Sequence, residues 1–239
     1  NNFKNSLVYE GTKILFDDGI EIEINDLNNK IEITQNISQS KILFLNGKLS
    51  DKDIVYSGAT NILKNYSSTD INGLTGCLTF SNLNLVNVNI EANGSSCEDT
   101  INLINVSGNL NNISIKNSYS DALDVDFSNI KVNNINILNA GNDCVDFSYG
   151  SYYLGNLKMQ QCGDKSLSVG ENSFVQLDSI TANDTKIGIA SKDSSLTLLN
   201  EASFKNLKTC LTAYNKKQEF DGSIIKVNKF ICNNFKKKI

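Results

Sequence analysis

The chain has 239 residues, 40% of them hydrophobic, and a formal net charge of −4. An acidic balance weighs against general nucleic-acid binding, which requires clustered basic residues. No apolar run approaches the roughly 20 residues of a membrane-spanning helix. The composition therefore predicts one elongated domain over residues 1–239, without a nucleic-acid partner and without a membrane span.

Residues 1–76 contain short alternating apolar runs that do not match the later part of the chain. We expect irregular coils here, with residues 1–12 as a cap over an otherwise bare sheet edge. Residues 50–76 are polar and poorly periodic, which favours a loop. The coil over residues 78–100 is one residue longer than those that follow.

Residues 101–232 divide without gaps into six segments of 22 residues. The segments begin at Ile101, Leu123, Val145, Leu167, Ile189 and Leu211. A fixed period in this range predicts stacked repeats, and 22 residues are too few for a pair of helices. Regular coils are thus expected over residues 77–232, followed by a short basic tail at 233–239.

Alternation within one segment predicts the fold. Leu123 and Val125 point one way and Asp124 and Asp126 the other, and two further alternating pairs follow before the next segment. Three short strands per turn, parallel from coil to coil, make an all-β parallel β-helix solenoid. We expect a right-handed coil, because parallel crossover connections are almost always right-handed.

Two irregularities interrupt the repeat. In the last two full coils the third strand slips by one residue, which indicates a bulge or a turn of different length. The stretch 215–220 (NKKQEF) also breaks the pattern before the last turn closes.

The six cysteines form no CxxC motif, and His is absent, so a zinc site is not expected. Cys210 and Cys232 lie 22 residues apart and would share a column in adjacent coils, within reach of a disulfide. Cys77 and Cys97 are a second candidate pair. We nevertheless favour buried free thiols for these residues.

Acidic residues recur at one corner of successive coils. One column contains Asp99, Asp121, Asp143 and Lys165, and the outward column of the first strand contains Asn102, Asp124, Asp146 and Ser168. Asp126, Ser148, Glu171 and Lys192 lie beside them. For the column of Asp121 we prefer a turn role, in which carboxylates satisfy the chain entering each strand. Asp124 and Asp146 are as much candidates for function as for structure.

Such a corner could serve catalysis, substrate binding or the binding of a metal ion. Asp121 and Asp143 could act as the acid and base of a hydrolase, or Lys165 or Lys192 as the base of a lyase. Asp126, Ser148 and Glu171 would bind substrate. Asp124 and Asp146 could hold Ca²⁺, which prefers oxygen ligands.

The ordered motifs YSDALDVDFS, GNDCVDFS, GDKSLSVGENS, IGIASKDSS and AYNKKQEF resemble known proteins. They look like the right-handed parallel β-helix proteins of the pectin-lyase-like group. The resemblance is strongest to the β-helix module that accompanies CotH-type kinase domains in bacterial surface proteins. It covers roughly residues 75–225 and implies the fold and an extracellular or cell-surface setting.

A looser resemblance is to the polygalacturonase family of glycoside hydrolases, whose consecutive coils carry NTD, GDD, GHG and RIK. Ser120-Asp121 falls at the first motif and Gly141-Asn142-Asp143 at the second. Asp164-Lys165-Ser166 falls at the third and Ser191-Lys192 near the fourth. Asn142 replaces one Asp, Lys165 replaces the His, and Arg is absent, so the family's supporting chemistry is missing.

Two classes of function remain open from the sequence. The chain is expected to be an extracellular or surface module that interacts with a polysaccharide or glycan through its Asp-rich face, with hydrolase or lyase activity left open. The alternative is a non-catalytic structural or adhesive element of a surface assembly or phage particle, with a surface or assembly partner.

Overall fold

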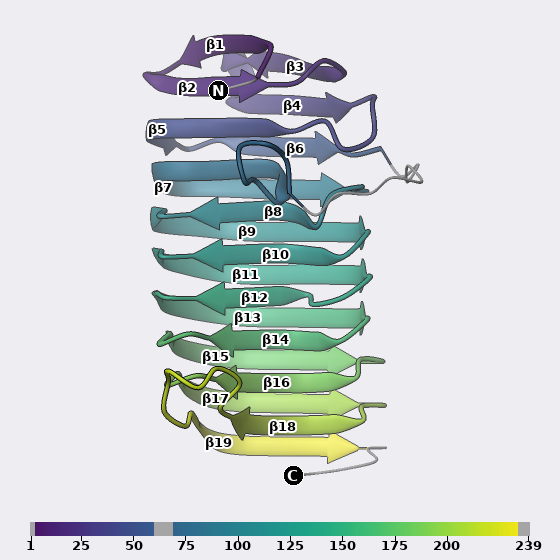
Figure 1. Ribbon diagram of the computed structural model, residues 1–239, viewed down its shortest axis with the longest axis vertical. Helices are drawn as coiled ribbons and strands as arrows, with labels where there is room; N and C mark the ends of the chain where they lie inside the picture. The colour runs from purple at the N-terminus through teal and green to yellow at the C-terminus, as the bar shows by residue number, and fades with distance from the viewer. Residues whose placement is uncertain (1–2, 60–68, 234–239) are drawn as a thin grey trace.

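The computed structural model describes residues 3–59 and 69–233 of the chain. They form an elongated stack of parallel β coils that winds from the N-terminal end to the C-terminal end (Figure 1). The expected right-handed parallel β-helix is therefore confirmed. Part of the predicted loop, residues 60–68, and the predicted tail from residue 234 onward lie outside the described residues.

The strands follow in chain order. They are β1 (Asn5–Tyr9), β2 (Thr12–Phe16), β3 (Ile20–Asn25), β4 (Lys30–Gln35), β5 (Ile42–Ser50), β6 (Asp53–Ser57), β7 (Gly76–Asn93), β8 (Asp99–Ile104), β9 (Ser107–Ser118), β10 (Asp121–Asp126), β11 (Asn129–Ala140), β12 (Val145–Ser148), β13 (Ser151–Cys162), β14 (Lys165–Gly170), β15 (Phe174–Asn183), β16 (Ile187–Lys192), β17 (Leu196–Lys205), β18 (Thr209–Tyr214) and β19 (Ile224–Asn233). One short 3-10 helix, η1 (Asp26–Asn28), joins β3 and β4.

Each regular coil contains one short strand and one long strand rather than three separate strands. The long strand β11 holds both later strands of the prediction: Ile130 and Val132 point inward, and then Ile135 and Ile137 do so. The change of parity between Val132 and Ile135 marks a corner, where Asn133 has no partner in the ladder. The predicted second and third strands are thus halves of one bent strand.

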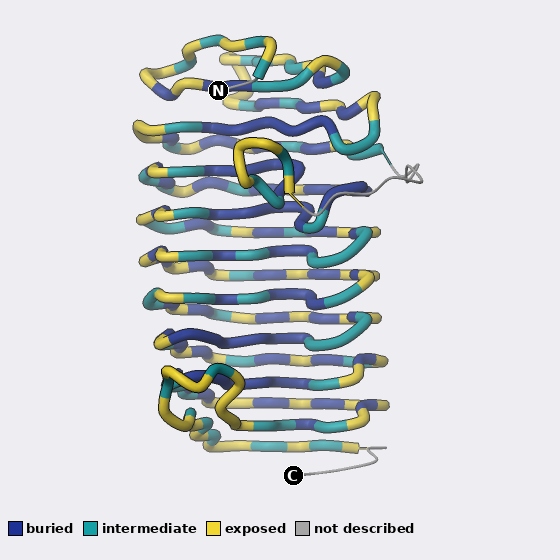
Figure 2. The backbone as a smooth tube through the Cα atoms, in the orientation of Figure 1, coloured by how far each residue is buried: buried dark blue, intermediate teal, exposed yellow. Residues whose placement is uncertain are grey.

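The interior is a continuous apolar column, as the period predicts. Leu123, Val145, Leu167 and Ile189 lie at equivalent positions of successive coils and are fully buried. In Figure 2 buried and exposed residues alternate along the long strands on the far side of the stack. The register proposed from the 22-residue repeat is therefore confirmed.

The N-terminal end departs from the parallel pattern. β1 pairs antiparallel with β2, β2 pairs antiparallel with β5, and β3 pairs antiparallel with β4. Residues 53–57, inside the predicted loop, form strand β6 and pair in parallel with β4 and β7.

Disulfides close three of the coils on themselves. The bonds are Cys77–Cys97, Cys144–Cys162 and Cys210–Cys232, so the preference for buried free thiols was wrong. Both pairs named from the sequence are confirmed, but the reasoning for the last one was not correct. Cys232 pairs in register with Phe204, so it ends the long strand of its own coil and does not share the column of Cys210.

The one-residue slip of the last coils lies in a turn. Glu171 and Asn172 both adopt left-handed backbone conformations, as do Asp193 and Ser194. The corresponding turns of the earlier coils contain a single left-handed residue. The extra residue shifts the pairing of the next strand, so that Ser151 faces Phe174. The prediction of a turn of different length is confirmed.

Candidate functional site

The short strands of the coils form one face, and two loops cover it in part. The described residues 69–75 lie over the N-terminal coils, and the loop between β18 and β19 lies over the C-terminal coils, where it contacts the ends of β14 and β16 (Figure 1). Beneath these covers β8, β14 and β16 are buried along nearly their whole length. Among the described short strands of the regular coils, β10 and β12 in the middle and β18 at the C-terminal end present outward side chains that are partly accessible.

Specific contacts hold the C-terminal loop in place. The carboxylate of Asp193, fully buried, accepts hydrogen bonds from the backbone N–H groups of Lys216 and Lys217, at 2.6 and 2.8 Å. The ammonium of Lys217 lies 2.7 Å from Glu171 Oε1. The ring of Phe220 packs on Tyr149, with centroids 6.2 Å apart. We call the accessible outward side of β10 and β12 the window. The loop therefore forms one wall of this window.

The acidic corner consists of Asp121, Asp124 and Asp126 of β10 with Asp143 and Asp146 in and beside β12. Asp124 and Asp146 are partners in the parallel register, so their carboxyl groups point outward from adjacent strands. Strands in a sheet lie about 4.8 Å apart. The structure thus brings together the two residues that the sequence proposed as metal ligands.

The column of Asp121 carries turn hydrogen bonds. Asp121 Oδ1 accepts from the backbone N–H of Asp143 at 2.8 Å, and Asp143 Oδ1 accepts from the backbone N–H of Lys165 at 2.9 Å. Each carboxylate thus fixes the start of the next coil, which is the turn role expected from the sequence. Asp143 is only 3% exposed.

Burial raises the pKa of the acids in this column. The pKa of Asp121 rises to about 7, because burial disfavours its charge and the carboxyl of Asp143 is close. The pKa of Asp143 rises to about 6, since the attraction of Lys165 offsets only part of the burial. Asp99, at the covered end of the column, has a pKa of about 7 for the same primary reason. Asp99 was visible in the sequence column but was not included among the site residues.

Asp124, Asp126 and Asp146 share this behaviour. Burial is the main cause of the raised pKa of each, and the neighbouring carboxyl groups raise the pKa values of Asp124 and Asp126 further. Asp124 Oδ2 accepts a hydrogen bond from Asn102 Nδ2 at 3.0 Å. Because the pKa values of these neighbouring acids are raised, their carboxyl groups keep a proton to higher pH than usual, and a protonated carboxyl can donate as well as accept a hydrogen bond.

The two candidate basic residues occupy fixed positions. Lys165 lies 3.2 Å from Asp143 Oδ2 and 2.5 Å from Asp164 Oδ2. Burial alone would lower the pKa of Lys165, but these two carboxylates raise it above its ordinary value. The ammonium therefore keeps its proton, which weighs against Lys165 as a general base. Lys192 lies 3.9 Å from Asp146 Oδ2.

The proposed substrate-binding residues meet at the edge of the window. Ser148 donates a 2.7 Å hydrogen bond to Glu171 Oε2. Burial would raise the pKa of Glu171, but hydrogen bonds from Lys217 and Ser148 hold it below its usual range. Lys217 was not found from the sequence, because its loop returns from two coils away. Asp126 is the direct register partner of Ser148 on the adjacent strand.

An exposed pair of aromatic rings borders the same window and was not predicted from the sequence. Phe127 and Tyr149 stack with centroids 5.0 Å apart, and both have left-handed backbone, with φ of 52° and 49°. Bulky residues adopt this conformation rarely. Equivalent turns of other coils use Asn105 and Asn172, so the two rings replace the residue type that the turn favours.

In residues 3–59 and 69–233 no group of three or more Asp, Glu, Cys or His side chains is arranged to hold a metal ion. The same residues contain no helix long and apolar enough to cross a bilayer. Comparisons with protein-family models, with curated proteins and with solved structures found no match.

Proposed function

We propose that the chain is a carbohydrate-binding module, and that the acidic corner is its binding site. The observation that carries this proposal is the position of the window: between the two covering loops, the strands left open are those that bear Asp124, Asp126 and Asp146. In a purely structural solenoid, Asp124, Asp126 and Asp146 would only lower the stability of the fold. Each carboxylate is partly removed from water, and neighbouring carboxylates repel one another.

Uncharged sugars suit this window best. Carboxylates accept hydrogen bonds from sugar hydroxyls, and carboxyl groups that keep a proton can donate one in return. The acids outnumber the lysines here, so an anionic sugar would be repelled. Phe127 and Tyr149 add an apolar border against which a sugar ring can pack. The likeness of the motifs to pectin-lyase-like modules of bacterial surface proteins supports an extracellular setting, as do the three disulfides.

Binding is favoured over catalysis. A hydrolase needs an accessible acid and base on either side of the scissile bond. Asp143 is nearly inaccessible and is held by Lys165, while Asp121 is committed to the backbone of the next coil. The proposal therefore assigns recognition, rather than bond cleavage, to this corner.

Calorimetric titration with uncharged oligosaccharides tests the proposal. Asp124→Ala and Asp146→Ala are each expected to weaken binding about tenfold, the effect of losing a charged hydrogen-bond partner. Asp178→Ala, which removes an exposed carboxylate from a different face, should bind as the wild type does. Equal affinity of all three variants, or no binding heat across the sugar panel, would refute the assignment.

A structural role is the second candidate, and the column of Asp121 favours it. The hydrogen bonds from this column to the following coil, together with asparagine ladders along the stack, explain these residues without a ligand. In a spacer or adhesive element of a surface assembly, the window would be buried against a partner. Loss of sugar binding together with protection of Tyr149 in such an assembly would support this role.

A further inference from the structure

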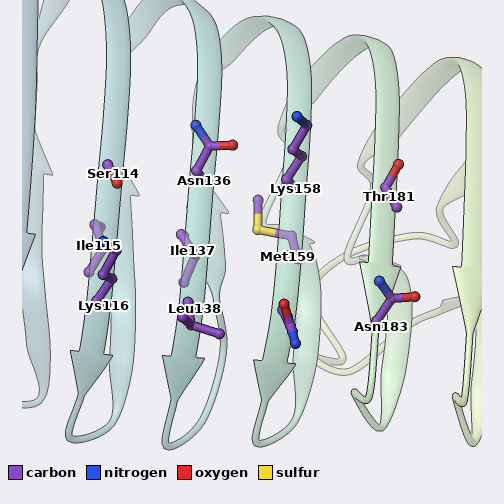
Figure 3. Close-up of a pocket in the computed structure, with 11 residues that line it drawn as sticks. Ser114, Ile115, Lys116, Asn136, Ile137, Leu138, Lys158, Met159, Thr181 and Asn183 are labelled. Atoms are coloured by element: carbon purple, nitrogen blue, oxygen red, sulfur yellow. The ribbon is translucent and has the colours of Figure 1, made fainter.

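The strands at the two ends of the stack are paired on one side only. In the middle of the stack each strand has a neighbour on both sides, as Figure 3 shows for the long strands that carry Ser114, Asn136 and Lys158. Among the described residues, by contrast, β18 pairs with β16 alone and β19 with β17 alone. At the other end β1 pairs with β2 alone and β3 with β4 alone. The backbone groups along such an edge can pair with another chain.

Both ends also leave part of the apolar interior accessible. Leu211 and Val227 point inward in the last coil but are only partly buried, whereas Ile189, one coil earlier in the column of Leu211, is fully buried. Leu7 and Ile22 of the first strands are likewise only partly buried. A coil placed on either end would therefore remove apolar surface from water, which favours association.

The strand edges at the two ends have matching positions and directions. β18 ends the column of the short strands, and β1 begins this column, because it pairs through β2 with the start of β5. β19 ends the column of the long strands, and β3 begins the second half of that column through β4 and β6. In two copies stacked on one axis, β1 would run parallel to β18 and β3 antiparallel to β19. Both arrangements can form a hydrogen-bonded ladder.

The charges of the ends decide which ends can meet. Residues 3–32 contain seven carboxylates and three lysines, whereas residues 201–233 contain six lysines and three carboxylates. Glu21 and Glu23 are exposed on the edge strand β3, and Lys226 and Lys229 are exposed on the edge strand β19. Two N-terminal ends or two C-terminal ends would repel each other, but an N-terminal end attracts a C-terminal end.

We propose that copies of this chain associate end to end, with the N-terminal end of one copy on the C-terminal end of the next. In this arrangement β1 and β3 continue the columns of β18 and β19. A head-to-tail contact along one axis does not close, so the product is a rod that lengthens with protein concentration. The window lies on the side of the stack and stays open in such a rod, so the association does not depend on sugar binding.

Sedimentation velocity at rising protein concentration tests the association. At about 20 mM sodium chloride the average mass of the wild type should rise with concentration, and at about 500 mM it should fall towards that of the monomer, because salt screens the attraction between the ends. Electron microscopy of the low-salt sample should show rods of constant width. A wild type that stays monomeric at low salt, or that forms side-by-side assemblies, would overturn the proposal.

Reversal of charge at one end tests the contact. Lys226→Glu/Lys229→Glu makes both ends acidic and should weaken the association about tenfold or more. Lys131→Glu/Lys158→Glu is the matched control, because it makes the same charge change at exposed positions in the middle of the stack. It should associate as the wild type does. An equal loss in both double variants would show an effect of net charge alone and would overturn the contact between the ends.

Exchange of the charges between the ends gives a rescue experiment. Glu21→Lys/Glu23→Lys makes both ends basic and should also weaken the association. A variant with all four changes has a basic N-terminal end and an acidic C-terminal end, so its association should recover towards that of the wild type. Circular dichroism checks that each variant melts as the wild type does. A folded fourfold variant that associates no better than the two double variants would overturn the head-to-tail arrangement.

Discussion

The ammonium nitrogen of Lys192 lies 3.9 Å from Asp146 Oδ2, although the two residues belong to coils that are not adjacent. The side chain of Lys192 crosses the intervening coil at Gly170, where a Cβ atom would lie 3.3 Å from Lys192 Cε. A glycine at this point leaves the path open. The positive charge beside Asp146 therefore comes from a lysine two coils away.

Removal of that charge should destabilise the fold. Lys192→Met leaves Asp146 without its cation, and at pH 8 we expect a loss of about 3 kcal/mol in the free energy of unfolding, typical of breaking a buried ion pair. At pH 5 the loss should be smaller, because Asp146 can take up a proton. Urea unfolding at both pH values measures this. Lys186→Met, at an exposed lysine, is the control, and an equal loss at both pH values would contradict the pairing.

Stability should fall as the pH rises from about 4 to about 7. The pKa values of Asp99, Asp121 and Asp143 lie at about 7, 7 and 6 in the folded chain, above those of the unfolded chain. The folded chain therefore binds more protons in this window, and deprotonation favours unfolding by about 1.4 kcal/mol per pKa unit and group. Above about pH 7 these carboxyl groups are ionised in the folded and the unfolded chain alike, so they no longer change the free energy of unfolding as the pH rises.

Thermal unfolding between pH 4 and pH 9 measures this slope. Asp121→Asn should flatten it, because the amide does not titrate, whereas Asp178→Asn should leave it unchanged. A melting temperature that rises steadily from pH 4 to pH 7 would show that these carboxyl groups are not buried in their neutral form.

The calcium site proposed on Asp124 and Asp146 remains a prediction. The ammonium of Lys192 competes for Asp146, so we expect a weak site with a dissociation constant of about 1 mM. Calcium at ten times that concentration should then stabilise the fold by about 1.4 kcal/mol, a rise of about 4 °C in melting temperature. Asp124→Asn/Asp146→Asn should remove the rise. The same rise with magnesium, or in the double variant, would exclude a specific site.

The buried column allows a direct test of register. Val145→Asp places a charge where Val145 is fully buried between coils, which costs several kcal/mol. We expect no cooperative unfolding transition by circular dichroism. Lys131→Asp, which alters an exposed outward position of the neighbouring strand, should fold normally. A soluble Val145→Asp variant that melts cooperatively would contradict the buried position.

The sequence predicted the stack because its signal is local and repeated. Residues such as Leu123 and Val145 recur every 22 positions, and one register satisfies all the coils. Covering loops are different: Lys217 reaches Glu171 through a segment with no period, so the wall that this loop forms beside the acidic corner could not be derived. The Cys144–Cys162 disulfide was not predicted, because it joins the two ends of one coil, and residues of one coil do not share a repeat column.

The closed coils have a mechanical consequence. Force applied along the stack would peel coils one after another, because each pairs only with its neighbours. Cys144 and Cys162 are joined over a sequence separation of 18 residues, so the chain between them cannot extend when its coil detaches. At about 3.4 Å per residue this withholds roughly 60 Å of extension. The oxidised chain should therefore lengthen in shorter steps than the reduced chain, with the missing length assigned to the three coils that carry disulfides.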